Sequence, residues 1–354
     1  MVLAPIERLP VELLQPVFIA AGHEIALIQA STYIAARLSS EYIYHSTCDH
    51  YLTEVHGRRA ELSAAQTSIF SSRWMTWDFF KSWILRRYGP TGCLCGRTPG
   101  NGGCFDAQWP PNFKDTSQMV FSRSHLPQLA VVKGRIPRKL LSGPWTEDKI
   151  KFLRFLLWIT AMTVDWMDSE TAQVAITGRK QAMLQRNFEA VELFNHNRRL
   201  GRPADLETVR FAVMQAGCDR SIVYDTLIAA NLWYGKKRAR YSPELHEWCD
   251  SRTADGDPKG RWLQKKLCES RILSSHEEAQ AINDCSPLCL DPAAEAYEGG
   301  PEDTLTTHKL HWNEVRVLSF PAGGSGLVGR SALMFYASQL AALVGSRWLV
   351  AQRQ

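Results

Sequence analysis

Between residues 145 and 275 the sequence repeats one pattern, in which a residue that favours helix N-termini precedes a run with apolar side chains at helical spacing. Thr146 precedes an acidic first turn and the run KIKFLRFLLWITAM, and Asp205, Asp219 and Ser242 precede similar runs. The side-chain oxygens of Ser, Thr and Asp accept hydrogen bonds from the unpaired N–H groups of a first helical turn. The pattern therefore predicts a series of helices and a mainly α fold.

The same region gives a weak indication of repeated structure. Ser169 is predicted to open one helix, and residues 187–201 to continue it or form another. Residues 205–235 resemble an ankyrin-type helix hairpin, through the amphipathic run before AVMQAGCD. No second copy recurs in the sequence at a fixed period, so we expect a single irregular helix-turn-helix rather than a repeat array.

Residues 66–88 carry a second apolar pattern of helical spacing. Phe70, Trp74, Trp77 and Ile84 would share one face of a single helix, which Gly89-Pro90 ends. The following GPTGCLCGRTPGNGGCFDAQWPPNF is rich in Gly and Pro and predicts a long irregular insertion. LAVVKGRI, residues 129–136, is the best strand candidate in this part of the chain, and a short hairpin is possible there.

Composition restricts the class of protein. The chain has 354 residues, 45% of them hydrophobic, which is enough for two or more domains. The formal net charge of +5 is too small to indicate nucleic-acid binding. The start MVLAPIERLP lacks the pattern of a secretory signal, and nine scattered cysteines fit reduced thiols better than a disulfide framework. We therefore expect a cytoplasmic or nuclear protein.

One stretch near the C-terminus has the length of a membrane span. Residues 331–350, SALMFYASQLAALVGSRWLV, are mostly apolar, but Gln339 and Arg347 interrupt them and leave a polar stripe. An amphipathic helix is the preferred interpretation, and no membrane partner is expected.

Two motifs resemble sites for metals or cofactors. Cys93, Cys95 and Cys104 provide three of the four ligands that a structural zinc site needs, and His125 could complete the set; thiols in a loop are the preferred interpretation. GSGLVG, residues 324–329, matches G-x-G-x-x-G but leaves no room for the rest of a dinucleotide-binding unit. We expect neither a bound metal nor a cofactor.

Three further clusters have ordinary structural explanations. His45, Cys48, His50 and His56 fit a half-buried helix better than a ligand set. The carboxylates of DWMDSE, residues 165–170, suit a helix N-terminus around Ser169 better than a cation site. GKKRAR, residues 235–240, could be a nuclear localisation signal, but basic runs of this kind are more often solvated loops, which is the preferred interpretation. No nucleophile motif such as G-x-S-x-G is present, so the sequence gives no positive indication of an enzyme.

The N-terminal fifty residues predict three short helices with a small, incomplete core. LPVELLQPVF, followed by LIQASTYIAARLSSEYIY, resembles the F-box-like segment common in fungal proteins. In that segment a Leu-Pro-x-Glu-Leu-Leu-x-x-Ile-Phe helix is followed by a Leu-x-x-Ala-Ser helix and a Leu-Ser-Ser turn. The similarity covers roughly residues 7–45, about an eighth of the chain.

The resemblance implies a protein-docking function. In this interpretation the first helix meets a Skp-type adaptor and links the chain to a cullin ubiquitin ligase, as a helix that buries its spare apolar face on a partner. The residues expected to make this contact are Leu9, Pro10, Leu13, Leu14, Val17 and Phe18.

The expected organisation follows from these assignments. Residues 1–55 would be the F-box-like unit, 56–145 a Trp-rich helix with a Gly/Cys-rich loop, 146–285 an irregular helical domain that receives an unknown client protein, and 286–354 a linker and tail. Two alternatives remain at this point: an enzyme or accessory protein of an uncharacterised fungal family, in secondary metabolism for instance, and a plain helical scaffold whose first helices complete its core.

Overall fold

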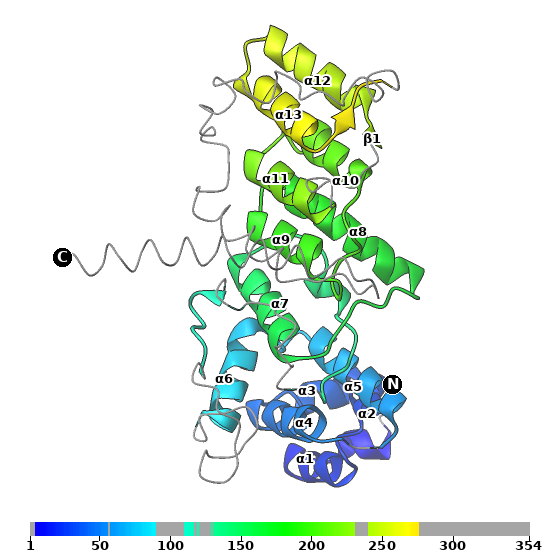
Figure 1. Ribbon diagram of the computed structural model, residues 1–354. Coiled ribbons are helices and arrows are strands. Elements are labelled where there is room, and N and C mark those ends of the chain that lie inside the picture. The colour runs from blue at the N-terminus through cyan, green and yellow to red at the C-terminus, as the bar shows by residue number, and fades with distance from the viewer. Residues whose placement is uncertain are drawn as a thin grey trace, which may run out of the picture.

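The computed structural model describes residues 4–55, 57–89, 110–116, 119, 129, 131–230 and 240–275. These residues are mainly helical, as the sequence predicts, and form an elongated column with the N-terminal helices at one end and α12 and α13 at the other (Figure 1). The lower part contains η1 (Pro5–Arg8), α1 (Val11–Ala20), α2 (Ile25–Ala30), α3 (Thr32–Arg37), α4 (Glu41–Thr53), α5 (Arg59–Ser71) and α6 (Trp77–Tyr88).

The remaining elements form the upper part of the column. Its helices are η4 (Arg138–Leu140), α7 (Glu147–Ile159), α8 (Ser169–Leu184), α9 (Phe188–His196), α10 (Leu206–Arg210), η5 (Phe211–Gln215), α11 (Arg220–Ala229), α12 (Pro243–Ala254) and α13 (Pro258–Glu269). Strands β1 (Arg240–Tyr241) and β2 (Ile272–Leu273) pair in parallel beside α12 and α13.

Most of the predicted helix starts are confirmed by side-chain hydrogen bonds. Thr146 accepts from the N–H of Lys149, and Asp205 and Asp219 also cap the helices that follow them. The expectation for DWMDSE needs one correction, because Asp168 and not Ser169 is the cap of α8. The Asp168 carboxylate accepts from the N–H groups of Glu170 and Thr171, two and three positions ahead, as an N-cap residue does.

Among the described residues the upper helices form three stacked pairs, whereas the sequence indicated a single irregular helix-turn-helix over residues 205–235. The pairs are α8 with α9, α10–η5 with α11, and α12 with α13, and Figure 1 shows α7, α9, α11 and α13 following one another up the column. The N-cap residues of the first helices are Asp168, Asp205 and Ser242, each 37 residues from the next. The period lies in the N-cap positions of the described helices and becomes visible once the helix starts are known.

Each pair also begins with the same polar contact, in which an arginine from the preceding unit holds the start of the next helix. The contacts are Arg138 to Asp168 at 3.0 Å and to Thr171 at 3.1 Å, Arg179 to Thr208 at 3.2 Å, and Arg210 to Ser242 at 3.0 Å. Guanidinium groups suit this place because their several N–H donors can satisfy a cap and a neighbouring oxygen together. The arginines therefore join successive units.

We predict that Arg210→Met lowers the free energy of unfolding by about 1–2 kcal/mol, because the fully buried Ser242 loses its charged donor while methionine keeps much of the packing. Urea unfolding followed by circular dichroism measures the loss. Arg261→Met, at an exposed position of α13, is the control and should change stability by less than about 0.5 kcal/mol. Equal stability of the two variants would contradict the joining role of Arg210.

The single helix expected over residues 66–88 is interrupted. α5 ends at Ser71, and α6 starts at Trp77 behind the N-cap Thr76. The break is held from a distance, because the Lys139 ammonium donates to the carbonyl oxygens of Ser72 and, at 3.0 Å, of Met75. Burial lowers the pKa of Lys139 to about 8.

The hairpin considered for residues 129–136 is not found in the described part of that stretch. Leu129 and Arg135 instead form isolated parallel bridges with Thr160 and Thr163, just after α7. Two strands joined by a hairpin turn run antiparallel, so these parallel bridges are not part of a hairpin. Their partners, Thr160 and Thr163, come after the intervening helix α7.

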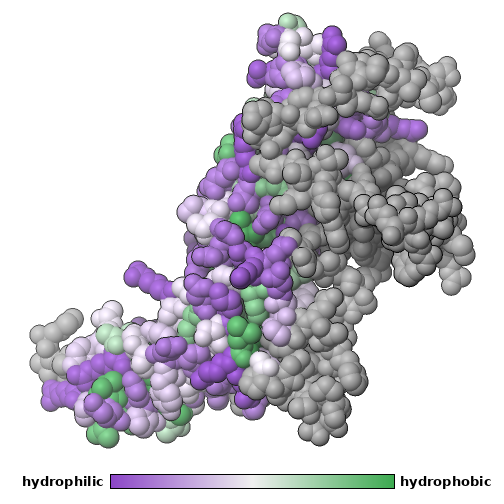
Figure 2. Space-filling model, turned by 90° about the vertical axis from the view of Figure 1, so that its left-hand side faces the viewer, coloured by the Kyte–Doolittle hydropathy of each residue, from purple (hydrophilic) through white to green (hydrophobic). Residues whose placement is uncertain are grey.

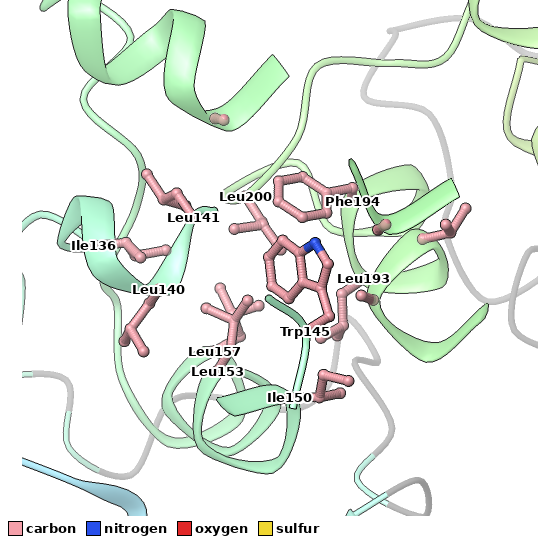
Figure 3. Packing of buried hydrophobic residues seen from close by; sticks show 14 of the residues in the cluster. Ile136, Leu140, Leu141, Trp145, Ile150, Leu153, Leu157, Leu193, Phe194 and Leu200 are labelled. Carbon is pink, nitrogen blue, oxygen red and sulfur yellow. The ribbon is translucent and has the colours of Figure 1, made fainter. Parts of the chain in front are cut away.

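The main core runs through the column and includes residues from α4 to β2. Figure 3 shows the part around Trp145, where the indole lies among leucines of α7 and α9. Its Nε1 donates to the carbonyl oxygen of Gly178 in α8 at 3.2 Å. A Cβ at Gly178 would lie 1.8 Å from the carbonyl oxygen of Leu141, so only glycine allows α8 to approach this closely. Trp145 thus ties α7, α8 and α9 together.

A second, smaller core belongs to the N-terminal helices. Leu14, Phe18, Ile34, Leu38 and Ile43 are its buried residues. The stretch between α1 and α4 holds two short helices and not one, because Ser31 ends α2 and caps α3. Helix α4 joins the two cores, since Ile43 belongs to the smaller one and Cys48 and Leu52 to the main one. The N-terminal helices therefore form a unit with its own apolar centre, attached to the column through α4.

Several sequence motifs lie outside the described residues. These are Cys93, Cys95, Cys104, His125, His56, the basic residues 235–239, GSGLVG, the stretch 331–350 and the whole of 286–354. Among the helices that the structure does describe, none is long and apolar enough to cross a membrane.

Candidate protein-docking surface

Helix α1 has two apolar faces with different surroundings. Leu14 and Phe18 are completely buried, together with Ile34, Leu38 and Ile43. Leu13 is 55% exposed and Val17 is 43% exposed, although each is next in sequence to a buried residue. Successive residues of a helix point about 100° apart, which separates the two pairs. One face of α1 closes the small core, and the other meets solvent.

The structure divides the six contact residues that the sequence resemblance implied into buried and exposed ones. Leu14 and Phe18 are sealed inside the N-terminal unit and cannot meet a partner unless that unit opens. Leu9 is partly buried against the same core, and Pro10 is exposed. Only Leu13, Val17 and Pro10 of the six are freely presented on the surface.

The exposed face of α1 includes residues that were not among the six implied by the resemblance. Pro16 and Ala20 are also exposed, so Leu13, Pro16, Val17 and Ala20 form an apolar stripe at spacings of three and four residues. We call these four residues the α1 stripe. Figure 2 shows apolar surface among polar residues at the lower end of the molecule, where the N-terminal helices lie. A stripe of this spacing is the form in which a helix is presented to a partner groove.

Two prolines shape this helix. Pro10 is its N-cap residue, and its carbonyl oxygen accepts from the N–H of Leu14 at 2.9 Å. Pro16 lies inside the helix, where it has no N–H to donate to the carbonyl of Glu12. The second proline adds to the apolar surface of the stripe without occupying the core.

The start of α1 is fixed to α3 by polar contacts. The Arg37 guanidinium donates to the carbonyl oxygen of Leu9 and lies 4.4 Å from the centre of the Tyr33 ring. Ser31 donates to the Glu7 carboxylate at 2.5 Å, and this hydrogen bond lowers the pKa of Glu7. These contacts fix the residues just before α1 on α3, in addition to the packing of the buried face of α1.

The histidine and cysteine cluster on α4 is part of the packing, as the sequence indicated. His45 and Cys48 are buried, and the Cys48 thiol has a pKa raised well above its usual value, first because of burial. Cys249, on α12, behaves similarly, and burial raises its pKa to about 12. A thiol that stays protonated is a poor nucleophile and a poor metal ligand.

The carboxylates of DWMDSE also act structurally. Asp168 accepts hydrogen bonds from Thr171 and Arg138, which lower its pKa to about 2. Glu170 pairs with Arg138, and Asp165 lies 3.7 Å from the Arg135 guanidinium. These contacts explain the acidic cluster without a cation.

A polar cleft that the sequence did not reveal lies between α5, the segment 135–139 and the start of α8. Thr67, Ser71 and Arg135 line both of its two parts. Thr67 accepts from the backbone N–H of Arg135 at 2.7 Å and donates to Ser63, so its hydroxyl is fully engaged. No histidine lines either part. Asp165 and Asp168 line one part of the cleft, and both face arginines, since Asp165 lies 3.7 Å from the Arg135 guanidinium and Asp168 accepts from Arg138 at 3.0 Å.

Comparison with known proteins adds no assignment. No family model matches the chain, and no curated protein or solved structure matches it. Among the described residues, the α1 stripe and the stacked helix pairs are the features that bear on function.

Proposed function

We propose that this protein is a non-catalytic adaptor resembling an F-box substrate receptor. The N-terminal helical unit docks on a Skp-type adaptor protein through the α1 stripe, and the column of helix pairs holds a client protein. In this role the chain connects a client with a cullin ubiquitin ligase and carries out no chemistry itself.

The exposure of the α1 stripe is the observation that supports the proposal. A helix that only completed a core would bury its large apolar side chains, whereas Leu13 and Val17 are 55% and 43% exposed. Leu14 and Phe18 hold the same helix in place from behind, so the stripe is presented on a fixed support. A preorganised apolar surface loses little conformational entropy when it binds.

The architecture of the column supports the second half of the proposal. Helix pairs stacked side by side give an extended surface, and such arrays commonly bind other proteins. The N-terminal unit has its own core and meets the column through α4, so docking at one end leaves the column accessible.

The test is docking of the full chain on a Skp-type adaptor. We expect Leu13→Asp/Val17→Asp to weaken adaptor binding by about 100-fold or more, because two carboxylates would have to be buried without partners. Affinity is measured by calorimetry or by titrated co-purification. Both side chains face solvent in the free chain, so circular dichroism and the unfolding midpoint should stay close to wild type.

The matched control places the same charges elsewhere. Leu184 is 55% exposed and Met214 is 48% exposed, on α8 and η5 of the column. Leu184→Asp/Met214→Asp therefore makes an equivalent chemical change at equivalent exposure, and adaptor affinity should remain as in wild type. Equal recovery of the adaptor with the α1 variant, the control variant and wild type would defeat the proposal.

A further inference from the structure

The turn between α1 and α2 is attached to α4 through His23. His23 has a left-handed backbone, with φ of 59°, and is only 6% exposed. Its Nε2 lies 2.7 Å from the Ser46 hydroxyl, and Tyr51 donates to the carbonyl oxygen of His23 at 3.0 Å. This turn is thus one of the places where the N-terminal unit meets the column.

The His23 ring is enclosed by other rings. It stacks on His50 of α4, with centroids 4.9 Å apart and an angle of 22°, and it meets the edge of Phe18 from α1 at 5.4 Å. Its Nδ1 is buried and has no hydrogen-bond partner among the described residues. A neutral imidazole can leave one nitrogen without a partner at moderate cost, but a protonated ring would bury a charged N–H there.

The charged and titratable groups near His23 make their contacts with other residues. The Glu24 carboxylate accepts from the N–H of Ala26 and caps α2. Asp49, on α4, accepts from the Trp83 indole at 2.9 Å and pairs with Arg86. His45 lies against Phe79 and 3.3 Å from Glu41. The Tyr51 hydroxyl donates to the backbone carbonyl oxygen of His23, and burial is the main cause that raises the pKa of Tyr51. None of these contacts places a carboxylate against His23.

We propose that His23 is a pH-sensitive latch, which holds the turn between α1 and α2 against α4 when it is neutral and releases α1 when it is protonated. Burial, and then the proximity of His50, lower the pKa of His23 from its usual 6.5. Above pH 6.5 the folded and open forms are both neutral, and the latch has its full strength. Below that value the open form takes up a proton that the closed form resists, so closing weakens as the pH falls.

Hydrogen exchange of the full chain tests the latch without any partner. After correction for intrinsic rates, we expect the opening equilibrium of α1 amides to rise by up to about tenfold for each pH unit below 6.5, since one proton is involved. Amides of α11 serve as the internal reference and should show no such change. Unchanged α1 protection between pH 7.5 and 5.5 would overturn the proposal.

Two variants locate the effect. In His23→Asn the new residue tolerates the left-handed backbone and does not titrate, so the pH response of α1 should disappear. His50→Phe keeps an aromatic ring beside His23 but removes its charge, so the response should become smaller as the pKa of His23 moves back toward 6.5. A His23→Asn variant that keeps the wild-type pH response would refute the assignment to His23.

A direct titration covers the case in which His23→Asn does not fold. The His23 ring resonance of the wild-type chain, followed by NMR, should show a titration midpoint below 6.5. A midpoint at or above 6.5 would show that the fold does not resist protonation of this ring, and the latch would be excluded.

Discussion

Replacement of Arg154 by methionine is expected to lower the free energy of unfolding by about 3–5 kcal/mol. Arg154 of α7 is 1% exposed and pairs with Glu192 of α9, which is 5% exposed. The substitution removes the guanidinium that pairs with a carboxylate buried between two core helices. Urea unfolding, monitored by circular dichroism and by tryptophan fluorescence, gives the change.

A double variant separates the charge effect from a packing effect. Arg154→Met/Glu192→Leu replaces both members of the pair by apolar side chains, and apolar replacement of an entire buried ion pair is often tolerated. We expect it to recover most of the stability that Arg154→Met loses. If the double variant is at least as unstable as the single one, lost packing and not the unpaired charge is responsible.

The second large effect is expected at Phe18. Phe18→Ala should destabilise the N-terminal unit by about 3–5 kcal/mol, the usual cost of removing a fully buried phenylalanine ring. The small core has few other buried side chains to close the cavity, so the loss should be local. Hydrogen exchange should show faster exchange in α1, α3 and the start of α4, with protection retained in α7, α9 and α11.

Leu13→Ala is the matched control for Phe18→Ala. It removes a comparable apolar side chain from the exposed face of the same helix, and its effect on stability should be below about 0.5 kcal/mol. The pair also separates two causes of lost docking, since Phe18→Ala would act by unfolding the unit and changes at Leu13 by altering its surface. Loss of protection throughout the column in Phe18→Ala would contradict the independence of the two cores.

Much of the secondary structure follows from local chemistry and was predictable from the sequence. Thr146, Asp205 and Asp219 cap helices because their side-chain oxygens reach N–H groups only two or three residues ahead. The break between α5 and α6 was missed, because the lysine that holds it follows more than sixty residues later in the chain. The stacked pairs were also missed, since their common period lies in the caps and their arginine partners and not in an apolar pattern.

The candidate surface was predictable only in part. The sequence placed apolar residues along the first helix, and a resemblance suggested that they face a partner. The sequence could not show which of these residues are exposed and which are buried. Leu13 and Leu14 have the same side chain and differ only in their surroundings in the fold. The His23 latch gave no local signal either, since Ser46, His50 and Tyr51 lie more than twenty residues away in sequence.

The sequence by itself determined that this chain is helical and where many of its helices begin, because helix periodicity and capping act within a few residues. The tertiary structure alone decided which side of α1 is left for a partner, how the helices pair and what holds His23. Burial depends on residues that meet across the fold, and no short stretch of sequence carries that information.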